Sequence, residues 1–219
     1  MQQSLFKHFT RSEHADHFLE GRLLFRTLQY FVDYEDGQVR GDQNEGTHVY
    51  RPDQGLRLDM VDGRKLPMLG SEFRSSVAKG HIYVFCMSTS RSEKLAAEFA
   101  SLACVEVQNK RQFLERVRAA LEAKGKMVFA GQLSYRSRSE PPAHRWALPE
   151  VICMTKSPDF KRQFEYRIAF AEPEVFAPEN VEVRIVPQGH REGAMPAHIE
   201  SLTIDVGSIG DICLVHDKA

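Results

Sequence analysis

The alternation of apolar and polar residues along the chain predicts several strands. Residues 81–87 (HIYVFCM) are nearly all apolar and rich in strand-forming types, which is typical of a buried central strand. Residues 55–61 alternate apolar and polar side chains, as a half-buried strand does. Further strands are expected at 4–9, 22–28, 104–108, 127–135, 150–156, 163–170, 181–187 and 211–216.

Helical periodicity is clearest in residues 111–125, where four apolar side chains share one face and a glycine closes the segment. A second helix is expected at 11–20, with Thr10 as its N-cap, and a third at 91–100. Residues 29–55 form a long polar stretch with little periodicity. Such a stretch in a compact domain is usually functional or partly disordered.

The order of these elements predicts an α+β fold. Most strands follow one another without an intervening helix, and about three helices fall in the first half. We therefore expect one domain over residues 1–219, with mixed or antiparallel sheets, since a chain of this length fits one sizeable domain.

Composition narrows the classes of function. The formal net charge is -1, whereas proteins that bind duplex nucleic acid through its phosphates usually carry a basic excess. The chain shows no signal peptide or membrane-spanning stretch, so we expect a cytoplasmic protein without a membrane partner. The four cysteines are far apart in apolar segments, which favours buried reduced thiols. No glycine-rich loop has dinucleotide or P-loop spacing.

The serine-rich end of the central strand allows two roles. Ser90 and Glu93 fit a capping box at the start of the following helix. Ser88 and Thr89 are not explained by that role. Hydroxyls at the end of a buried strand, before a helix N-terminus, can also hold a ribose or a phosphate.

The strand at 163–170 carries a polar row. Phe164, Tyr166, Ile168 and Phe170 are expected to face the core, and Gln163, Glu165 and Arg167 the other side. That side is either a solvated face with a weak ion pair or the wall of a cleft that holds Glu165 rigidly.

Three weaker signals remain. The carboxylates of the acidic stretch could hold a divalent cation, as in a metal-dependent nuclease, although a solvated loop with internal ion pairs fits better: Asp33, Glu35, Asp36, Asp42 and Glu45. His14 and His17 are three residues apart, but no third metal ligand has suitable spacing. The loop 136–150 combines arginines with Trp146, a pattern that can bind nucleotides by charge and stacking.

The order of His8, the Ser88–Ser90 stretch and Gln163-x-Glu165 resembles the ADP-ribosyltransferase fold. In that fold a His or Arg on the first strand, a Ser, Thr or Tyr position on a later strand and a final Glu surround NAD. The first-strand position is ambiguous, because Arg26 offers an arginine where His8 offers a histidine.

This resemblance implies an NAD-dependent enzyme that acts on a protein or nucleic-acid acceptor without a metal. Glu165 would stabilise the positive charge that develops as the nicotinamide–ribose bond breaks, and Gln163 would orient the acceptor. The hydroxyls of Ser88, Thr89 and Ser90 would support the nicotinamide-ribose side. His8 or Arg26 would hold the adenosine ribose or a phosphate.

A second resemblance spans most of residues 5–170. The stretches LFKHF…FLEGRLLFRTLQYFVDYED, YVFCMSTS and FEYRIAF look like a large bacterial family of uncharacterised function. The asparagine and proline of that family's acidic turn are missing here, and Gln163 replaces a glutamate. The likeness implies a fold and a pocket, and leaves open a non-catalytic binding module such as a phage- or defence-associated partner protein.

Overall fold

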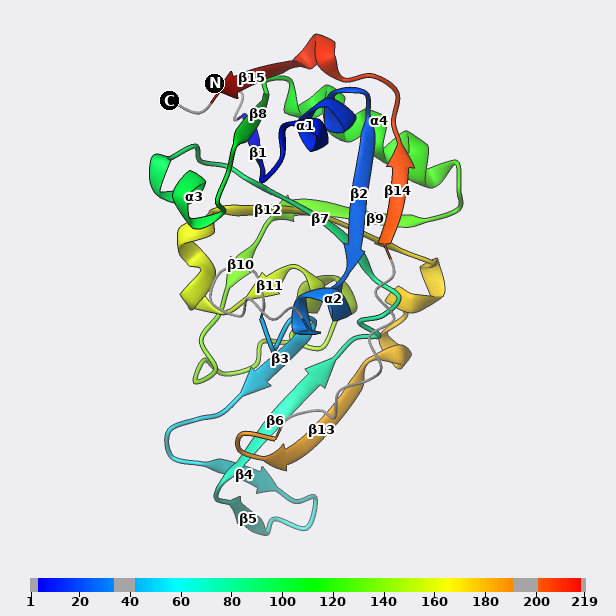
Figure 1. Cartoon of the computed structure of the whole chain (residues 1–219). Coiled ribbons are helices and arrows are strands. Elements are labelled where there is room, and N and C mark those ends of the chain that lie inside the picture. The colour runs from blue at the N-terminus through cyan, green and yellow to red at the C-terminus, as the bar shows by residue number, and fades with distance from the viewer. Residues whose placement is uncertain (1–3, 34–41, 191–200, 218–219) are drawn as a thin grey trace.

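A computed structural model of the protein describes residues 4–33, 42–190 and 201–217. The described residues form α-helices and a main sheet of eight strands (Figure 1). The main-sheet strands are β1 Leu5–Phe9, β2 Arg22–Thr27, β7 Tyr83–Ser88, β8 Ala103–Val107, β9 Met127–Gln132, β12 Glu165–Ala171, β14 Ser201–Asp205 and β15 Cys213–Asp217. The α-helices are α1 Ser12–Leu19, α2 Leu28–Asp33, α3 Glu93–Glu98, α4 Lys110–Glu122 and α5 Pro149–Cys153.

Strand β7 lies at the centre of the main sheet, and the sheet divides along one of its edges. On one side β7 pairs with β12 along its whole length, from Tyr83↔Phe170 to Ser88↔Glu165. On the other side its first residues pair with β2 and its last residue pairs with β1. The sheet therefore has two branches, β2–β14 and β1–β8–β15, that diverge from the middle of β7.

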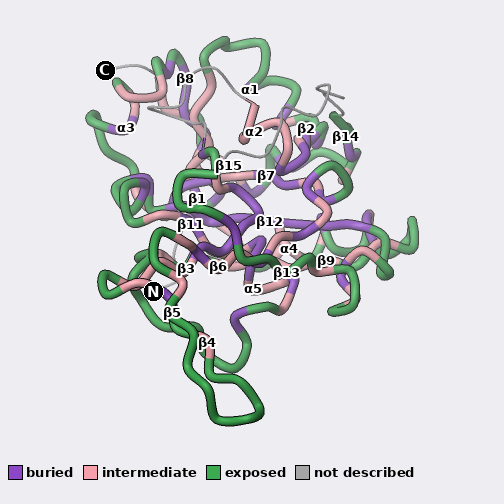
Figure 2. The backbone as a smooth tube through the Cα atoms, turned by 90° about the horizontal axis from the view of Figure 1, so that it is seen from below, coloured by how far each residue is buried: buried purple, intermediate pink, exposed green. Residues whose placement is uncertain are grey.

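Two hydrophobic cores pack against opposite faces of this sheet. The larger core joins α1 and α4 to one face and includes Phe18, Phe113, Ile168 and Phe170. The smaller core joins α2 and α5 to the other face and includes Leu28, Ile152 and Ala169. Strand β12 crosses the centre of the molecule between the cores, and all seven of its residues are buried (Figure 2).

Three smaller sheets lie below the main sheet in Figure 1. The first contains β3 Thr47–Tyr50, β6 Ser71–Ser76 and β13 Glu182–Pro187. A hairpin of β4 Leu56–Asp59 and β5 Lys65–Met68 projects from it and is largely exposed (Figure 2). The third is a short parallel pair, β10 Ser134–Tyr135 and β11 Thr155–Lys156.

One segment of chain, residues 201–217, connects the two branches of the main sheet. It pairs with β2 as β14 and with β8 as β15. Its connector also contacts the end of α1, where Ile209 N–H donates to Leu19 O at 2.9 Å. Gly21 adopts φ +89°, and a Cβ there would lie 2.0 Å from Gly207 O, so only glycine fits this crossing.

The α+β class and the antiparallel sheets confirm the sequence prediction, and most predicted strands are present. The residues expected to form a strand at 150–156 instead form α5 and the short strand β11. Pro149 at the start favours a helix, and burial of Ile152 and Cys153 in the smaller core outweighs their strand propensity. Because α2 and α5 were not predicted, the described residues contain five α-helices where about three were expected.

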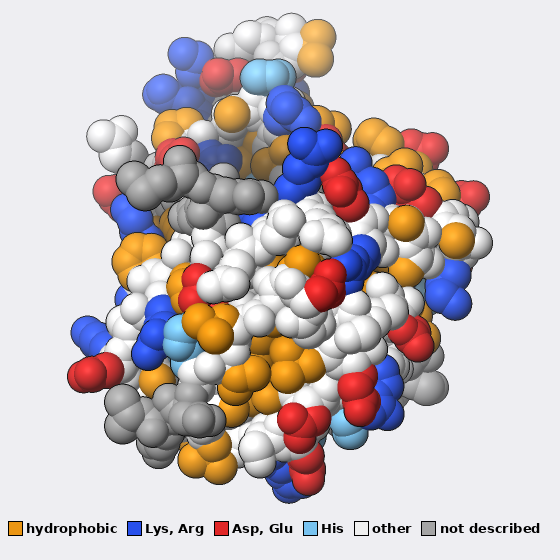
Figure 3. Space-filling model, turned by 90° about the horizontal axis from the view of Figure 1, so that it is seen from above, with side chains coloured by type: hydrophobic (Ala, Val, Ile, Leu, Met, Phe, Trp, Pro, Cys, Tyr) orange, Lys and Arg blue, Asp and Glu red, His pale blue; other side chains and the backbone are white. Residues whose placement is uncertain are grey.

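Within the described residues, no helix is long and apolar enough to cross a membrane. Lys and Arg side chains are interspersed with Asp and Glu side chains on the face seen from above (Figure 3). All four cysteines are free, and burial raises the pKa of each thiol well above its ordinary value. These thiols are therefore protonated at neutral pH.

Candidate functional site

A cavity of about 630 Å³ opens where the two branches of the main sheet diverge. Its described lining comes mainly from β1, β2, β7, α1 and α2. Phe99 after α3, Thr203 of β14, and Lys156, Gln163 and Glu165 of the β11–β12 region complete it. The volume lies in the range of ordinary small-molecule sites. We call this the branch cavity.

The branch cavity brings together most of the residues that the sequence singled out. Its lining includes His8, Arg26, Ser88, Gln163 and Glu165, which come from four strands and from the 3-10 helix Pro158–Gln163 before β12. Ser88 and Glu165 are direct neighbours across the β7–β12 ladder. Thr89 and Ser90 do not line the cavity. The ambiguity between His8 and Arg26 is not resolved, since both line it from opposite branches.

The serine stretch ties β7 to the turn that precedes β12. Ser88 Oγ lies 2.9 Å from Gln163 O and 2.8 Å from Ser90 O. Thr89 N–H donates to Phe164 O at 2.9 Å. The predicted capping box is wrong: Ser92 is the N-cap of α3, and its Oγ accepts from Leu95 N–H at 3.1 Å. The hydroxyl of Ser88 is thus engaged with main-chain carbonyls at the edge of the cavity.

Glu165 belongs to a buried cluster of four charged side chains, which we call the ion cluster: Glu45, Lys156, Glu165 and Arg167. The Arg167 guanidinium donates to Glu165 Oε1 from Nε at 2.9 Å and Nη2 at 2.8 Å, and from Nη1 to Glu45 Oε1 at 2.6 Å. Lys156 Nζ lies 3.2 Å from Glu165 Oε2. Two carboxylates and two cations leave the cluster with no net charge.

Electrostatics in the ion cluster keep Glu165 ionised. Burial alone would raise the pKa of Glu165, but Arg167 and Lys156 outweigh burial and lower that pKa to about 2. Burial would lower the pKa of Lys156, but Glu165 and Glu45 raise it above its usual range. The side of β12 that bears Glu165 and Arg167 is therefore buried, not a solvated face with a weak surface ion pair. Glu165 is an anion at neutral pH and lies at the wall of the branch cavity.

Cationic and aromatic side chains dominate the rest of the lining. Lys7 Nζ donates to Cys86 O at 2.6 Å and lies 4.2 Å from the centre of the Phe85 ring. Cys86 lies on the part of β7 between the residues that pair with β1 and those that pair with β2. The Arg26 guanidinium lies 4.8 Å from the centre of the Tyr30 ring. The described lining contains four Lys or Arg residues and three His residues but one carboxylate, Glu165. A planar, negatively charged ligand fits this chemistry.

His8 is neutral and offers one acceptor. Its Nδ1 lies 3.3 Å from Ser101 Oγ, whose own proton is donated to Ala103 O. Nδ1 is therefore the donor, and Nε2 carries a lone pair. That Nε2 is buried without a hydrogen-bond partner among the described residues. Burial, together with Lys7 and Arg91, lowers the pKa of His8.

The described carboxylates of the acidic stretch, Asp33, Asp42 and Glu45, each have a different hydrogen-bond or ion-pair partner. Asp33 accepts from Gln29 Nε2 at 3.0 Å, Asp42 accepts from Asn44 N–H at 2.9 Å, and Glu45 pairs with Arg167. Glu35 and Asp36 lie outside the described residues. Within the described residues no group of three or more His, Cys, Asp or Glu side chains could hold a metal ion.

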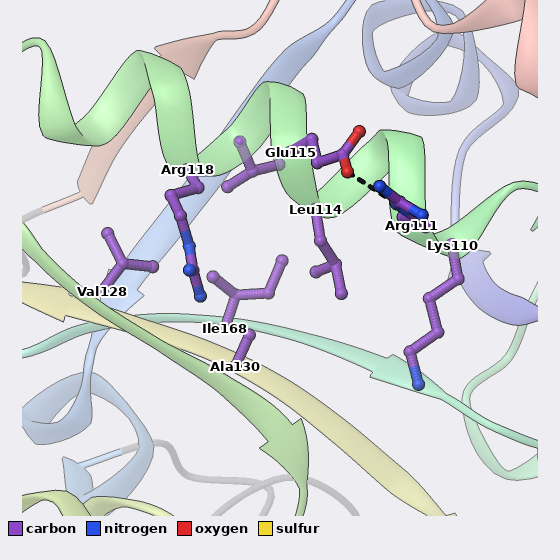
Figure 4. Close-up of a pocket in the computed structure, with 9 residues that line it drawn as sticks. Lys110, Arg111, Leu114, Glu115, Arg118, Val128, Ala130 and Ile168 are labelled. Carbon is purple, nitrogen blue, oxygen red and sulfur yellow. Dashed lines mark hydrogen bonds and ion pairs between the residues drawn. The ribbon is translucent and has the colours of Figure 1, made fainter.

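Two other cavities are present among the described residues, and the second shares Lys156 with the branch cavity. One, of about 480 Å³, lies between α4 and the sheet, where Leu114 points toward Ile168 and Ala130 and an Arg111–Glu115 ion pair lies along the helix (Figure 4). The other, of about 570 Å³, is lined by residues of β3, β11 and the loop that contains Arg136, Arg138 and Trp146. Arg145, which was grouped with that loop, pairs with Glu150 at 3.2 Å.

Several residues of the site were missed by sequence reasoning. Lys156 and Lys7 lie in segments that were expected to be ordinary strands, 150–156 and 4–9. Glu45 was grouped with the acidic loop. The sequence shows only that these residues are charged. Once Arg167 is known to be buried, charged partners for it and for Glu165 are expected, and these residues can supply them.

The comparisons with known proteins do not extend this description. No protein-family model, curated protein or solved structure matches the chain.

Proposed function

We propose that the branch cavity binds NAD and that the protein is an ADP-ribosyltransferase-like enzyme acting on a protein or nucleic-acid acceptor. One observation carries the proposal. Residues far apart in the sequence, which match the motif order of that fold, line one cavity whose cations outnumber its single described carboxylate. The divided sheet around this cavity is compatible with an ADP-ribosyltransferase-like fold.

The chemistry of each group suits a dinucleotide. Lys7 and Arg26 are positioned to neutralise a pyrophosphate, and the aromatic lining offers stacking partners for a base. His8 lines the same cavity as a neutral ring, although its acceptor Nε2 is shielded in this arrangement. Glu165 is ionised and faces the same cavity, so it can stabilise positive charge on the ribose as the glycosidic bond breaks.

The first test is binding. NAD should raise the melting temperature, because a ligand that binds only the folded state stabilises it. Arg26→Gln should weaken NAD affinity by about tenfold, the usual effect of one charge-assisted hydrogen bond. The control is Arg118→Gln on α4, which removes the same charge outside the branch cavity and should leave NAD affinity unchanged. If NAD does not shift the melting temperature of the wild-type protein, the proposal is wrong.

The second test is catalysis, measured as nicotinamide release. Glu165→Gln alone leaves excess positive charge in the ion cluster and can unfold the chain. We therefore pair it with Lys156→Met, which leaves Glu45 matched to Arg167. The paired variant should stay folded by circular dichroism and bind NAD, but release no nicotinamide.

A non-catalytic binding module is the second candidate, and a specific observation favours it. Both carboxylate oxygens of Glu165 already accept from Arg167 or Lys156, which reduces the negative charge available to a reacting ribose. In this case the wild-type protein would bind NAD or another nucleotide with the same dependence on Arg26 and release no nicotinamide.

A further inference from the structure

The third cavity, of about 570 Å³, lies across the ion cluster from the branch cavity, and Lys156 lines both. It is framed by β3, by β11 and by the loop that follows β10. We call it the tryptophan cavity, because Trp146 contributes to its wall and is the only tryptophan in the chain.

Three buried nitrogen atoms in the lining of the tryptophan cavity have no hydrogen-bond partner among the described residues: His48 Nε2, Arg136 Nε and Trp146 Nε1. The side chains are deeply enclosed, since His48 is 5% and Trp146 is 3% exposed. An unpaired buried polar group destabilises the folded protein, so three such groups around one cavity are not expected of a purely structural wall.

The protonation of these nitrogens specifies what they can bind. His48 Nδ1 lies 2.8 Å from Trp146 O, a carbonyl that can only accept, so Nδ1 carries the proton and Nε2 is an acceptor. Burial lowers the pKa of His48 to about 4, so the ring is neutral at physiological pH. Arg136 Nε and Trp146 Nε1 are donors. Arg136 Nε lies 3.7 Å from Glu140 Oε1, beyond hydrogen-bond distance, so the cavity presents one weakly paired donor, one unpaired donor and one unpaired acceptor.

Cations outnumber carboxylates by one in the lining, although three of the four cations are paired: Arg51 with Glu72, Arg136 with Glu140 and Lys156 with Glu165. Arg51, Arg136, Arg138 and Lys156 line the cavity together with three aspartates. Two of the aspartates accept local hydrogen bonds, Asp42 from Asn44 N–H and Asp159 from Ser157 Oγ. Arg138 is exposed and sits on the same loop as Arg136.

We propose that the tryptophan cavity binds a small hydroxylated phosphate ester, such as a sugar phosphate. The phosphate accepts from Arg136 and Trp146, and a hydroxyl group of the ligand donates to His48 Nε2. Because the three nitrogens are shielded in the present arrangement, the ligand reaches them with a small movement of the Arg136 loop. The site is separate from the branch cavity and does not depend on NAD binding there.

Fluorescence of the single tryptophan gives a direct readout. Ribose 5-phosphate should change Trp146 emission with a saturable dependence on concentration. Inorganic phosphate should bind about tenfold more weakly, because it lacks the hydroxyl that reaches His48, and ribose alone should give no saturable change. Equal affinities for phosphate and ribose 5-phosphate, or no saturable change with either, would overturn the proposal.

Variants locate the ligand. Arg136→Gln should weaken ribose 5-phosphate by about tenfold, and Arg138→Gln by less, since Arg138 is exposed. His48→Phe should remove the preference for ribose 5-phosphate over inorganic phosphate. Arg118→Gln is the matched control and should have no effect. If Arg26→Gln weakens the ligand as much as Arg136→Gln does, the ligand occupies the branch cavity and the proposal is wrong.

Discussion

The two faces of β12 are equally buried, but they are stabilised in different ways. On one face Tyr166, Ile168 and Phe170 pack into the larger hydrophobic core. On the other face Glu165 and Arg167 belong to the buried ion cluster. Their partners Lys156 and Glu45 come from other segments of the chain. An apolar face is stabilised by any well-packed neighbour, whereas a buried charge requires a specific partner.

On this single strand, one face therefore contributes mainly to folding and the other face contributes to the candidate site. The apolar face fixes β12 between β7 and β9 and beneath α4. The charged face holds the Glu165 carboxylate rigidly at the wall of the branch cavity, and its partner Lys156 lines both cavities. The costs of disturbing each face can be compared directly by substitution.

The largest effect is expected from removing the central cation. Arg167→Met leaves Glu165 and Glu45 buried without their guanidinium and should destabilise the protein by about 3–5 kcal/mol. Phe170→Ala on the opposite face should cost a similar amount, about 3–5 kcal/mol, through lost burial and a cavity. Urea unfolding measures both free energies. A cost below about 1 kcal/mol for Arg167→Met would contradict the ion cluster described here.

Acid should distinguish these two costs. The folded-state pKa of Glu165 is depressed to about 2, so its contribution is present above the unfolded value near 4.5 and is lost as the pH falls toward 2. The difference in unfolding free energy between wild type and Arg167→Met should therefore shrink between pH 5 and pH 3. The penalty of Phe170→Ala should stay nearly constant, because no titrating group is involved. Unfolding curves at several pH values test this.

Removing a matched pair should cost less than removing one charge. Lys156→Met combined with Glu165→Gln leaves Glu45 paired with Arg167, and we expect stability within about 2 kcal/mol of wild type. Glu165→Gln alone should be less stable than the double variant. A double-mutant cycle in urea gives the coupling energy, and additive effects would show that the two side chains do not interact in the folded protein.

The smallest effect is expected just before the strand begins. Phe164 is 46% exposed and adopts a left-handed φ of 47°, so Phe164→Ala should cost less than about 1 kcal/mol. Phe170→Ala is its matched comparison within the same segment. If the two substitutions cost the same, Phe164 contributes to the core as its alternation with Tyr166 predicted.

Alternation located the apolar face of β12 but not its limits. It placed Tyr166, Ile168 and Phe170 correctly because the two-residue repeat of a strand is a local property of the chain. It misplaced Phe164, because the 3-10 helix before β12 ends there in a left-handed turn that alternation cannot reveal. The same limit explains α5, where strand-forming residues follow a proline that starts a helix.

The candidate site could be predicted only in part, because some of its residues depend on tertiary contacts. His8, Ser88 and Glu165 lie on strands, and a motif order along the chain placed them together. Lys156 and Glu45 come from short elements whose position depends on the tertiary fold, and their role follows from the burial of Arg167. A sequence shows that a residue is charged, but whether that charge is buried depends on contacts between distant segments.

The segment 201–217, which pairs with both branches of the main sheet, has a consequence for the size of the branch cavity. β14 pairs with β2 and β15 pairs with β8 at fixed registers. The length of the connector between β14 and β15 therefore limits how far apart the two branches can lie. Each residue of extended chain spans only about 3.3–3.6 Å. Insertions or deletions in residues 206–212 therefore provide a way to widen or narrow the opening for a different ligand while every residue that lines it stays the same.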